Sequence, residues 1–323
     1  MAALMLVIIP LSAMAQGSSA EQTARARREV VERVADLIDH RYVDPVAGKR
    51  IARDLRRDPS KSIAGDTSAA FAKNFTDYLR TLSGDGHFAL DFDPSHEALP
   101  DGETADQTEL NRWYGPQVNY GFEQVARLDN GVGYLDLRVF APTEMGGDLA
   151  AAAMSLLAQS PALIIDLRRN GGGMGEMTHL LAGYLLDEIR EMSADYDRPN
   201  SRTTRHFTPA KVPGRRFGGI KPVYILVSKR TFSAAEAFAY DLQAMKRAIV
   251  IGEQTGGGAH PFFYRPAGHG FVLSLPEQRS INPITGGDWE GVGVTPDIRV
   301  SADTALDQAL AEATNNLSKK AMK

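Results

Sequence analysis

The segment "RTFSAAE" combines a serine with a glutamate three residues later, directly after the apolar run "KPVYILVS". This spacing matches a capping box, in which Ser233 caps a helix and Glu236 binds back to the serine amide. A serine between a buried strand and a helix is also suited to nucleophilic attack, because unpaired amides and the helix dipole stabilise an oxyanion there. The Ala234 amide would be one such donor. The segment alone leaves a structural cap and a nucleophile as alternatives.

A second segment, "LIIDLRRNGGG", runs from an apolar strand into three glycines. Because glycines let backbone amides approach a ligand, we expect Gly172 to supply a second oxyanion donor, with a tight structural turn as the alternative. A dinucleotide-binding loop would require G-x-G-x-x-G. Starting at Gly171, that pattern needs a glycine where Glu176 stands. Starting at Gly173, it needs one where Thr178 stands, so no cofactor is predicted here.

A serine nucleophile needs a general base, and the chain contains seven histidines and no cysteine. His87, in "LSGDGHFAL", lies between a glycine-rich loop and a strand, a setting that fixes the direction of a side chain. His260, in "GGGAHPFF", is its rival, and the residues alone do not decide between the two. Glu290, in "GGDWEGVG", is suited to orient an imidazole, with an ordinary carboxylate on a hairpin as the alternative.

Two other kinds of hydrolytic site find little support in the sequence. The histidines are scattered and no H-E-x-x-H motif is present, so no metal is predicted. The G-x-S-x-G elbow of lipase-type enzymes is also absent around Ser233.

The elements that must hold these residues fall into two regions. Residues 27–82 show the helical spacing of apolar side chains. The stretch 94–112 is polar and acidic with Pro and Gly, which predicts a surface loop or linker. We therefore place a boundary near residue 110. This predicts a small helical domain with its linker over residues 16–110 and a core domain over residues 111–323.

The predicted core domain alternates strand-like and helical segments. Its apolar runs include "VGYLDLRVF", "ALIIDLR", "PVYILVS" and "AIVIG", with helical spacing between them. This alternation predicts crossover units and a largely parallel, covered sheet, so the fold class is α/β. The stretch after Gly252 predicts loops and hairpins, and "ADTALDQALAEA" predicts a closing amphipathic helix.

Composition and the first residues bear on partners and location. A net charge of −4 without a run of Lys and Arg argues against a nucleic-acid partner. The apolar residues 2–11 followed by Ala13-Met14-Ala15 predict a signal peptide over residues 1–15, with a buried strand as the alternative. We therefore expect a periplasmic or secreted protein. We expect no stable membrane insertion after signal cleavage, because the apolar stretch is too short to span a bilayer.

Several of these segments together resemble one family in their order and spacing. They are "LRTLSGDGHFAL", "LIIDLRRNGGG", "VSKRTFSAAEAFAYDLQ", "IGEQTGGGAHP" and "WEGVGVTPDI". The chain is similar to the tail-specific proteases, the S41 serine peptidases, over nearly all residues after the predicted signal peptide. This resemblance implies a crotonase- or ClpP-like ββα spiral core with a small N-terminal helical-bundle domain.

The family has two arrangements of the base, and the resemblance distinguishes them. Gly258 stands where the lysine of the carboxyl-terminal processing proteases would fall. The chain looks instead like the tricorn core and the interphotoreceptor retinoid-binding protein modules, without a PDZ domain. By this resemblance Ser233 is the nucleophile, His87 is the general base, and Glu290 supports the histidine directly or through another group. Gly86 stands where the tricorn core has a serine.

The resemblance implies a serine peptidase acting on peptides or unfolded proteins. A non-catalytic binding module for a retinoid-like or fatty ligand is the alternative from another class, and an esterase using the same site is a third interpretation. The sequence leaves the oligomeric state open.

Overall fold

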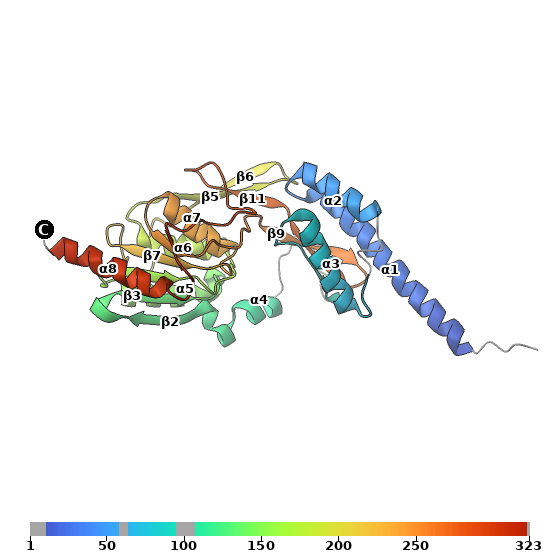
Figure 1. The fold of residues 1–323 in the computed structure, drawn as a ribbon, viewed down its shortest axis with the longest axis horizontal. Coiled ribbons are helices and arrows are strands. Elements are labelled where there is room, and N and C mark those ends of the chain that lie inside the picture. The colour runs from blue at the N-terminus through green and yellow to red at the C-terminus, as the bar shows by residue number, and fades with distance from the viewer. Residues whose placement is uncertain (1–10, 58–63, 95–106, 322–323) are drawn as a thin grey trace, which may run out of the picture. The chain divides into compact units, whose positions relative to one another are not determined.

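The computed structural model describes residues 11–57, 64–94 and 107–321 and divides the chain into two compact units (Figure 1). The first unit comprises Met1–Gly84, Phe88–Glu103 and Phe263–Leu275, and the second comprises Asp85–His87, Thr104–Phe262 and Pro276–Lys323. Most of the predicted signal peptide and most of the predicted linker lie outside the described residues. No helix within the described ranges is both long and apolar enough to cross a membrane.

The first unit contains three helices and a small sheet. The helices are α1 (Leu11–Arg41), α2 (Pro45–Arg57) and α3 (Ser68–Ser83). The strands pair in the order β1 (Ala89–Phe92), β10 (Phe271–Pro276) and β9 (Phe262–Gly268). Helix α3 begins where the Thr67 hydroxyl accepts the Ala70 amide at 3.1 Å, and it ends at Gly84 with a left-handed φ of 75°. The N-terminal helices predicted from the sequence are therefore present.

The predicted contiguous division differs from the observed units at more than one place. Asp85–His87, predicted as part of the helical domain, belong to the second unit. Residues 263–275, predicted as part of the core domain, belong to the first unit. The physical reason is strand pairing, because Ala89 to Phe92 pair antiparallel with Ser274 to Phe271. The edge of Phe271 also packs on Phe71 of α3, with ring centroids 5.1 Å apart.

The second unit is built on a six-stranded mixed sheet in the order β12-β8-β7-β4-β3-β2. In chain order the strands are β2 (Phe122–Arg127), β3 (Gly133–Leu137), β4 (Leu163–Asp166), β7 (Val223–Val227), β8 (Ile249–Gly252) and β12 (Ile298–Arg299). All neighbouring strands are parallel except β2, which is antiparallel to β3. The prediction of an α/β core is therefore confirmed.

Helices cover both faces of this sheet, which explains why β3, β4 and β7 are buried throughout. One face packs against α5 (Thr143–Leu157), α6 (Gly175–Leu185) and α7 (Ala234–Ala244). The other face packs against α8 (Ala305–Ala321), the predicted closing helix, through Ala305, Ala309 and Ala313. A second sheet has the order β11 (Gln278–Ile281), β5 (Glu191–Asp197) and β6 (Arg202–Phe207). The short helix α4 (Gln107–Tyr114) precedes β2.

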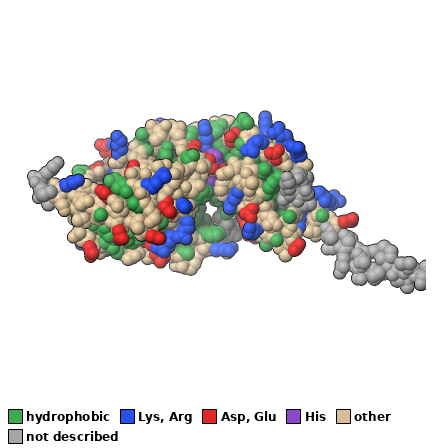
Figure 2. All heavy atoms as spheres, in the orientation of Figure 1, with side chains coloured by type: hydrophobic (Ala, Val, Ile, Leu, Met, Phe, Trp, Pro, Cys, Tyr) green, Lys and Arg blue, Asp and Glu red, His purple; other side chains and the backbone are tan. Residues whose placement is uncertain are grey.

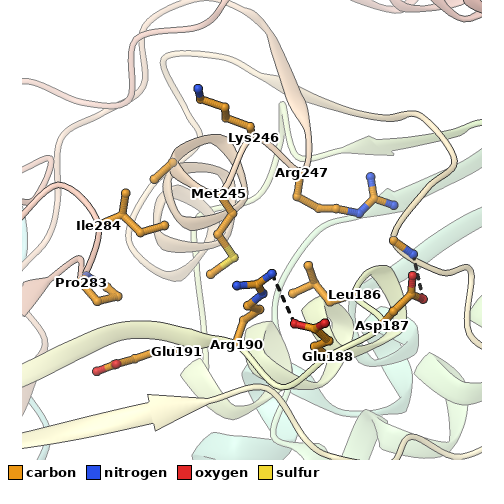
Figure 3. A pocket seen from close by; sticks show the side chains of 12 residues that line it. Leu186, Asp187, Glu188, Arg190, Glu191, Met245, Lys246, Arg247, Pro283 and Ile284 are labelled. Atoms are coloured by element: carbon orange, nitrogen blue, oxygen red, sulfur yellow. Dashed lines mark hydrogen bonds and ion pairs between the residues drawn. The ribbon is translucent and has the colours of Figure 1, made fainter.

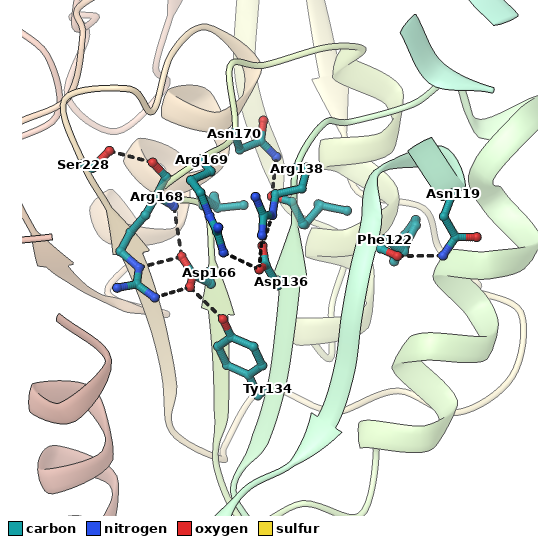
Figure 4. A network of polar contacts seen from close by, with 12 residues as sticks. Asn119, Phe122, Tyr134, Asp136, Arg138, Asp166, Arg168, Arg169, Asn170 and Ser228 are labelled. Atoms are coloured by element: carbon teal, nitrogen blue, oxygen red, sulfur yellow. Dashed lines mark hydrogen bonds and ion pairs between the residues drawn. The ribbon is translucent and has the colours of Figure 1, made fainter. Parts of the chain in front are cut away.

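A polar network fixes the loops that follow β3 and β4 (Figure 4). Asp166 accepts hydrogen bonds from Arg168 and from the hydroxyl of Tyr134, the latter at 2.7 Å. Asp136 pairs with Arg138 at 2.6 Å and with Arg169 at 3.1 Å. Asp166 ends β4 shortly before the glycine turn, and Arg169 links the loop before that turn to Asp136 of β3, so the network holds the loop against the sheet. On the face drawn in Figure 2, Lys and Arg side chains are interspersed with Asp and Glu.

Candidate active site

Ser233 lies in the turn between β7 and α7 and has an unusual backbone. Its φ of 53° and ψ of −125° are rare for a residue with a Cβ atom, and such strain often occurs at functional sites. The Ser233 amide donates to Glu236 Oε2 at 2.9 Å, as the capping box predicts. The Ser233 hydroxyl lies 3.1 Å from His87 Nε2. The serine thus starts the helix and also faces an imidazole.

His87, rather than its rival His260, is the histidine that contacts this hydroxyl. The residue is only 7% exposed, and its ring packs near two aromatic rings of the same unit. The centroid of Phe232 is 4.7 Å away and that of Phe262 is 5.9 Å away. These contacts fix the imidazole plane. The ring can therefore accept the serine proton at Nε2 while Nδ1 carries the other proton.

Asp85 is the carboxylate nearest to the other side of the His87 ring, and the sequence reasoning missed it. Asp85 Oδ1 accepts the His87 backbone amide at 2.9 Å and lies 3.6 Å from His87 Nδ1. Within the described residues His87 Nδ1 has no partner at hydrogen-bond distance. Burial alone would raise the pKa of Asp85, but the hydrogen bond from His260 and the nearby His87 ring outweigh it and hold that pKa below its usual range. The Asp-x-His spacing in "GDGH" was the available signal.

Glu290, predicted to support the base, contacts the second histidine instead of His87. His260 Nδ1 lies 2.7 Å from Asp85 Oδ2 and 3.6 Å from Glu290 Oε2. Glu290 Oε2 also accepts the Ala259 amide at 2.5 Å. Burial and the nearby charge of Asp85 raise the pKa of Glu290 to about 7. The predicted glutamate therefore belongs to the network, but through His260 and Asp85.

Asp85, His260 and Glu290 are also the only described residues that could jointly hold a metal ion, with ligand atoms within 4.8 Å of one another. A direct hydrogen bond already joins two of the three. The three side chains therefore form one polar cluster.

Gly258 approaches the base so closely that only glycine fits. A Cβ atom built on it would lie 2.7 Å from His87 Cε1 and 2.1 Å from Phe232 Cζ. Its amide donates to Glu236 Oε2 at 2.8 Å. The same carboxylate accepts the Gly257 amide at 2.7 Å and the Thr255 hydroxyl at 2.5 Å. Fully buried Glu236 therefore connects the serine turn to the loop beside His87. The capping box predicted only its contact with the Ser233 amide.

The two predicted oxyanion donors lie side by side but differ in their partners. No acceptor within the described ranges takes the Ala234 amide, which begins α7. The Gly172 amide instead donates to Asn170 Oδ1 at 2.8 Å. A Cβ atom on Gly172 would lie 2.8 Å from Ser233 Cβ and 3.2 Å from the Ala234 nitrogen. The glycine turn thus lies against Ser233, as expected. The Gly172 amide, however, already donates a hydrogen bond to Asn170.

A separate cavity of about 580 Å³ opens in the second unit and shares no lining residue with the serine site (Figure 3). Met245, Pro283 and Ile284 line its apolar part. Arg190 pairs with Glu188 across 3.5 Å. The lining residues include no serine and no histidine, so this cavity offers no pair of the kind seen at Ser233.

The chain is similar to known peptidases in sequence. The model of the family described as Peptidase family S41 matches residues 131–300, just over half of the chain. A carboxy-terminal-processing protease of Bartonella bacilliformis is 28% identical over 182 residues, which is 54% of this chain and 40% of that protein. The chloroplastic carboxyl-terminal-processing peptidase 1 of Arabidopsis thaliana is 30% identical over 187 residues, or 56% of this chain and 36% of that protein. The chain thus spans well under half the length of these relatives.

A solved structure of similar size extends the likeness to the whole fold. The structure of a putative peptidase from Parabacteroides merdae matches with a TM-score of 0.62 at 18% identity, covering 90% of this chain and 96% of that one. At this identity the likeness concerns the fold alone.

Proposed function

Because the chain belongs to peptidase family S41, we propose that it hydrolyses peptide bonds with Ser233 as nucleophile and His87 as general base. The 3.1 Å contact between Ser233 Oγ and His87 Nε2 carries this proposal. Asp85 orients the base, since its carboxylate is the acceptor nearest to His87 Nδ1.

The chemistry follows from these positions. Ser233 Oγ attacks the carbonyl carbon of the scissile bond while its proton passes to His87 Nε2. The Ala234 amide at the start of α7 donates to the oxygen that becomes negative. His87 returns the proton to the leaving amine as the carbon–nitrogen bond breaks. Water, deprotonated by His87, then attacks the serine ester and releases the acid product.

A second oxyanion donor requires a change at the glycine turn. The Gly172 amide points to Asn170 Oδ1, and a rotation of that side chain or peptide would free it. We propose that this donor is completed when substrate binds, because catalytic hydrogen bonds often tighten only in the complex.

The proposal also covers the substrate class, the type of fold and the location of the protein. Peptides or unfolded proteins are the expected substrates, by analogy with relatives whose names denote carboxyl-terminal processing. The parallel strands β3, β4, β7 and β8, with helices on both faces, support the crotonase- or ClpP-like spiral. The apolar residues 2–11 and the Ala13-Met14-Ala15 motif support export to the periplasm or the medium.

Labelling with a fluorophosphonate serine probe tests the proposal. We expect the protein to be labelled, and Ser233→Ala and His87→Ala to lose labelling while remaining folded by circular dichroism. Unlabelled protein is then offered unfolded polypeptides and simple acyl esters, which separates a peptidase from an esterase. Folded protein that is neither labelled nor active on any peptide would contradict the proposal and favour a binding module.

A further inference from the structure

Asp85 has two oxygens that serve two different histidines. Oδ1 accepts the His87 backbone amide at 2.9 Å and faces the ring of the same residue. Oδ2 lies 2.7 Å from His260 Nδ1. Because Asp85 is only 1% exposed, water cannot replace either partner. The group that holds Oδ2 therefore contributes to the orientation of the carboxylate toward His87.

His260 has a second carboxylate beside the nitrogen that contacts Asp85. Its Nδ1 faces Glu290 Oε2 at 3.6 Å, and Glu290 accepts the amide of Ala259, the residue before His260. The imidazole is largely buried, with 12% of its side chain exposed. Glu290 thus fixes the backbone of the His260 segment and lies beside the ring, without touching His87.

We propose that His260 is a positioning residue, which holds Asp85 in the orientation that His87 needs and transmits the effect of Glu290 to the base. This inference rests on the proposed function of Ser233 and His87. It gives the second histidine a role and explains how a glutamate that does not contact the base can affect hydrolysis. The pathway runs from Glu290 through His260 and Asp85 to His87 and Ser233.

The charges around His260 agree with a donor at Nδ1. Burial would lower the pKa of His260, but Asp85, Glu290 and the neighbouring Asp288 together raise it. The low pKa of Asp85 means that its carboxylate accepts, so the proton between Oδ2 and Nδ1 belongs to the imidazole. Removing His260 would leave a buried carboxylate short of one donor, and Asp85 would turn to satisfy it.

Three substitutions of His260 separate a positioning role from a merely structural one. Asparagine carries an amide donor close to the place of Nδ1, glutamine carries it one bond farther out, and alanine carries none. We expect His260→Ala and His260→Gln to slow fluorophosphonate labelling of Ser233 by roughly 10- to 100-fold, as loss of an outer partner does elsewhere. His260→Asn should stay within a few-fold of the unsubstituted protein. The exposed His269, whose ring contacts Glu29 in the first unit, provides the control His269→Asn.

A double-mutant cycle tests the path from Glu290. Glu290→Ala should slow labelling in the unsubstituted protein but add almost nothing in His260→Ala, because its effect passes through the missing ring. The pH at which labelling is half-maximal should also move in His260→Gln and not in His269→Asn. Should His260→Ala fail to fold, the comparison of the asparagine and glutamine variants decides.

The outcomes for this inference and for the proposed function are distinct. Equal labelling rates for the asparagine and glutamine variants, or additive effects of Glu290→Ala and His260→Ala, would overturn the positioning role alone. Labelling that does not require Ser233 or His87 would overturn the proposed function itself.

Discussion

The ring of His87 occupies the space that any side chain on Gly258 would need. A Cβ atom there would meet His87 Cε1 at 2.7 Å and Phe232 Cζ at 2.1 Å. The family resemblance puts the lysine base of other members at this position. A side chain at position 258 and the observed position of the His87 ring therefore exclude each other, which agrees with the proposal that His87 is the base.

Substituting Gly258 should consequently disable the base. In Gly258→Ala the new methyl group displaces the His87 ring, and a displacement of about 1 Å can lower catalysis on the order of 100-fold. Overpacking should also lower the free energy of unfolding by about 1–3 kcal/mol. Labelling rates and thermal unfolding check both effects. Gly147→Ala in α5 is the control, since nothing lies within 4 Å of its new Cβ and stability should rise slightly.

Gly172 faces the serine from the other side. Its φ of 117° disfavours any Cβ, and the added atom would lie 2.8 Å from Ser233 Cβ. We expect Gly172→Ala to abolish measurable labelling. Gly171→Ala, where nothing lies within 4 Å and φ is not positive, should retain it. Full labelling of Gly172→Ala would show that the glycine turn is not part of the reaction site.

Asp85→Asn tests the carboxylate that orients the base. The amide has nearly the same shape but can present a donor to His87 or to His260, which reverses one of the two hydrogen bonds. We expect labelling to slow on the order of 10²- to 10⁴-fold while the thermal midpoint changes little. A rate within a few-fold of the unsubstituted protein would mean that His87 needs no carboxylate partner.

A pair of histidines outside the site should govern stability in acid. The rings of His179 and His206 stack with centroids 5.0 Å apart, and His206 Nε2 contacts Asp195 at 2.8 Å. Burial and the neighbouring His206 lower the pKa of His179 to about 4, so the fold prefers the neutral ring. The stabilisation that this preference gives is present above pH 6.5, the usual histidine value, and is lost as pH falls toward 4.

The size of this acid effect can be measured directly. His179 should account for up to about 3 kcal/mol of the stability lost between these pH values. Urea unfolding of His179→Phe should show a smaller loss over the same range. The pKa of His206 is raised, first by its hydrogen bond to Asp195, so its own stabilisation acts in the opposite sense and is lost as pH rises. An unchanged pH profile in His179→Phe would contradict the prediction.

Much of the site could be predicted because its chemistry follows local patterns. The serine turn, the glycine turn and the α/β alternation each arise from a short segment, and the structure places Ser233 beside His87 as expected. Asp85 was missed although it stands two residues before His87, because a carboxylate in a glycine-rich loop looks like an ordinary turn residue.

Other features depend on contacts that no local pattern encodes. The pairing of residues 271–274 with residues 89–92 links segments about 180 positions apart and moves part of the predicted core into the first unit. The partner of Glu290 depends in the same way on where three separate loops meet. The hydrogen bond from Gly172 to Asn170 depends on one peptide orientation, which a glycine-rich sequence leaves free.

The backbone of Ser233 lies in an unfavourable region of φ and ψ, and the surrounding hydrogen bonds and packing must hold it there. Replacing the residue by glycine removes the strain and replacing it by alanine does not, while both remove the hydroxyl. Ser233→Gly should therefore be more stable than Ser233→Ala, by about 1–2 kcal/mol in urea unfolding. Equal stabilities would mean that the turn is unstrained. In the intact protein, moderate heating should relax this single turn before the rest of the molecule unfolds. Labelling of Ser233 should therefore be lost at a lower temperature than the fold.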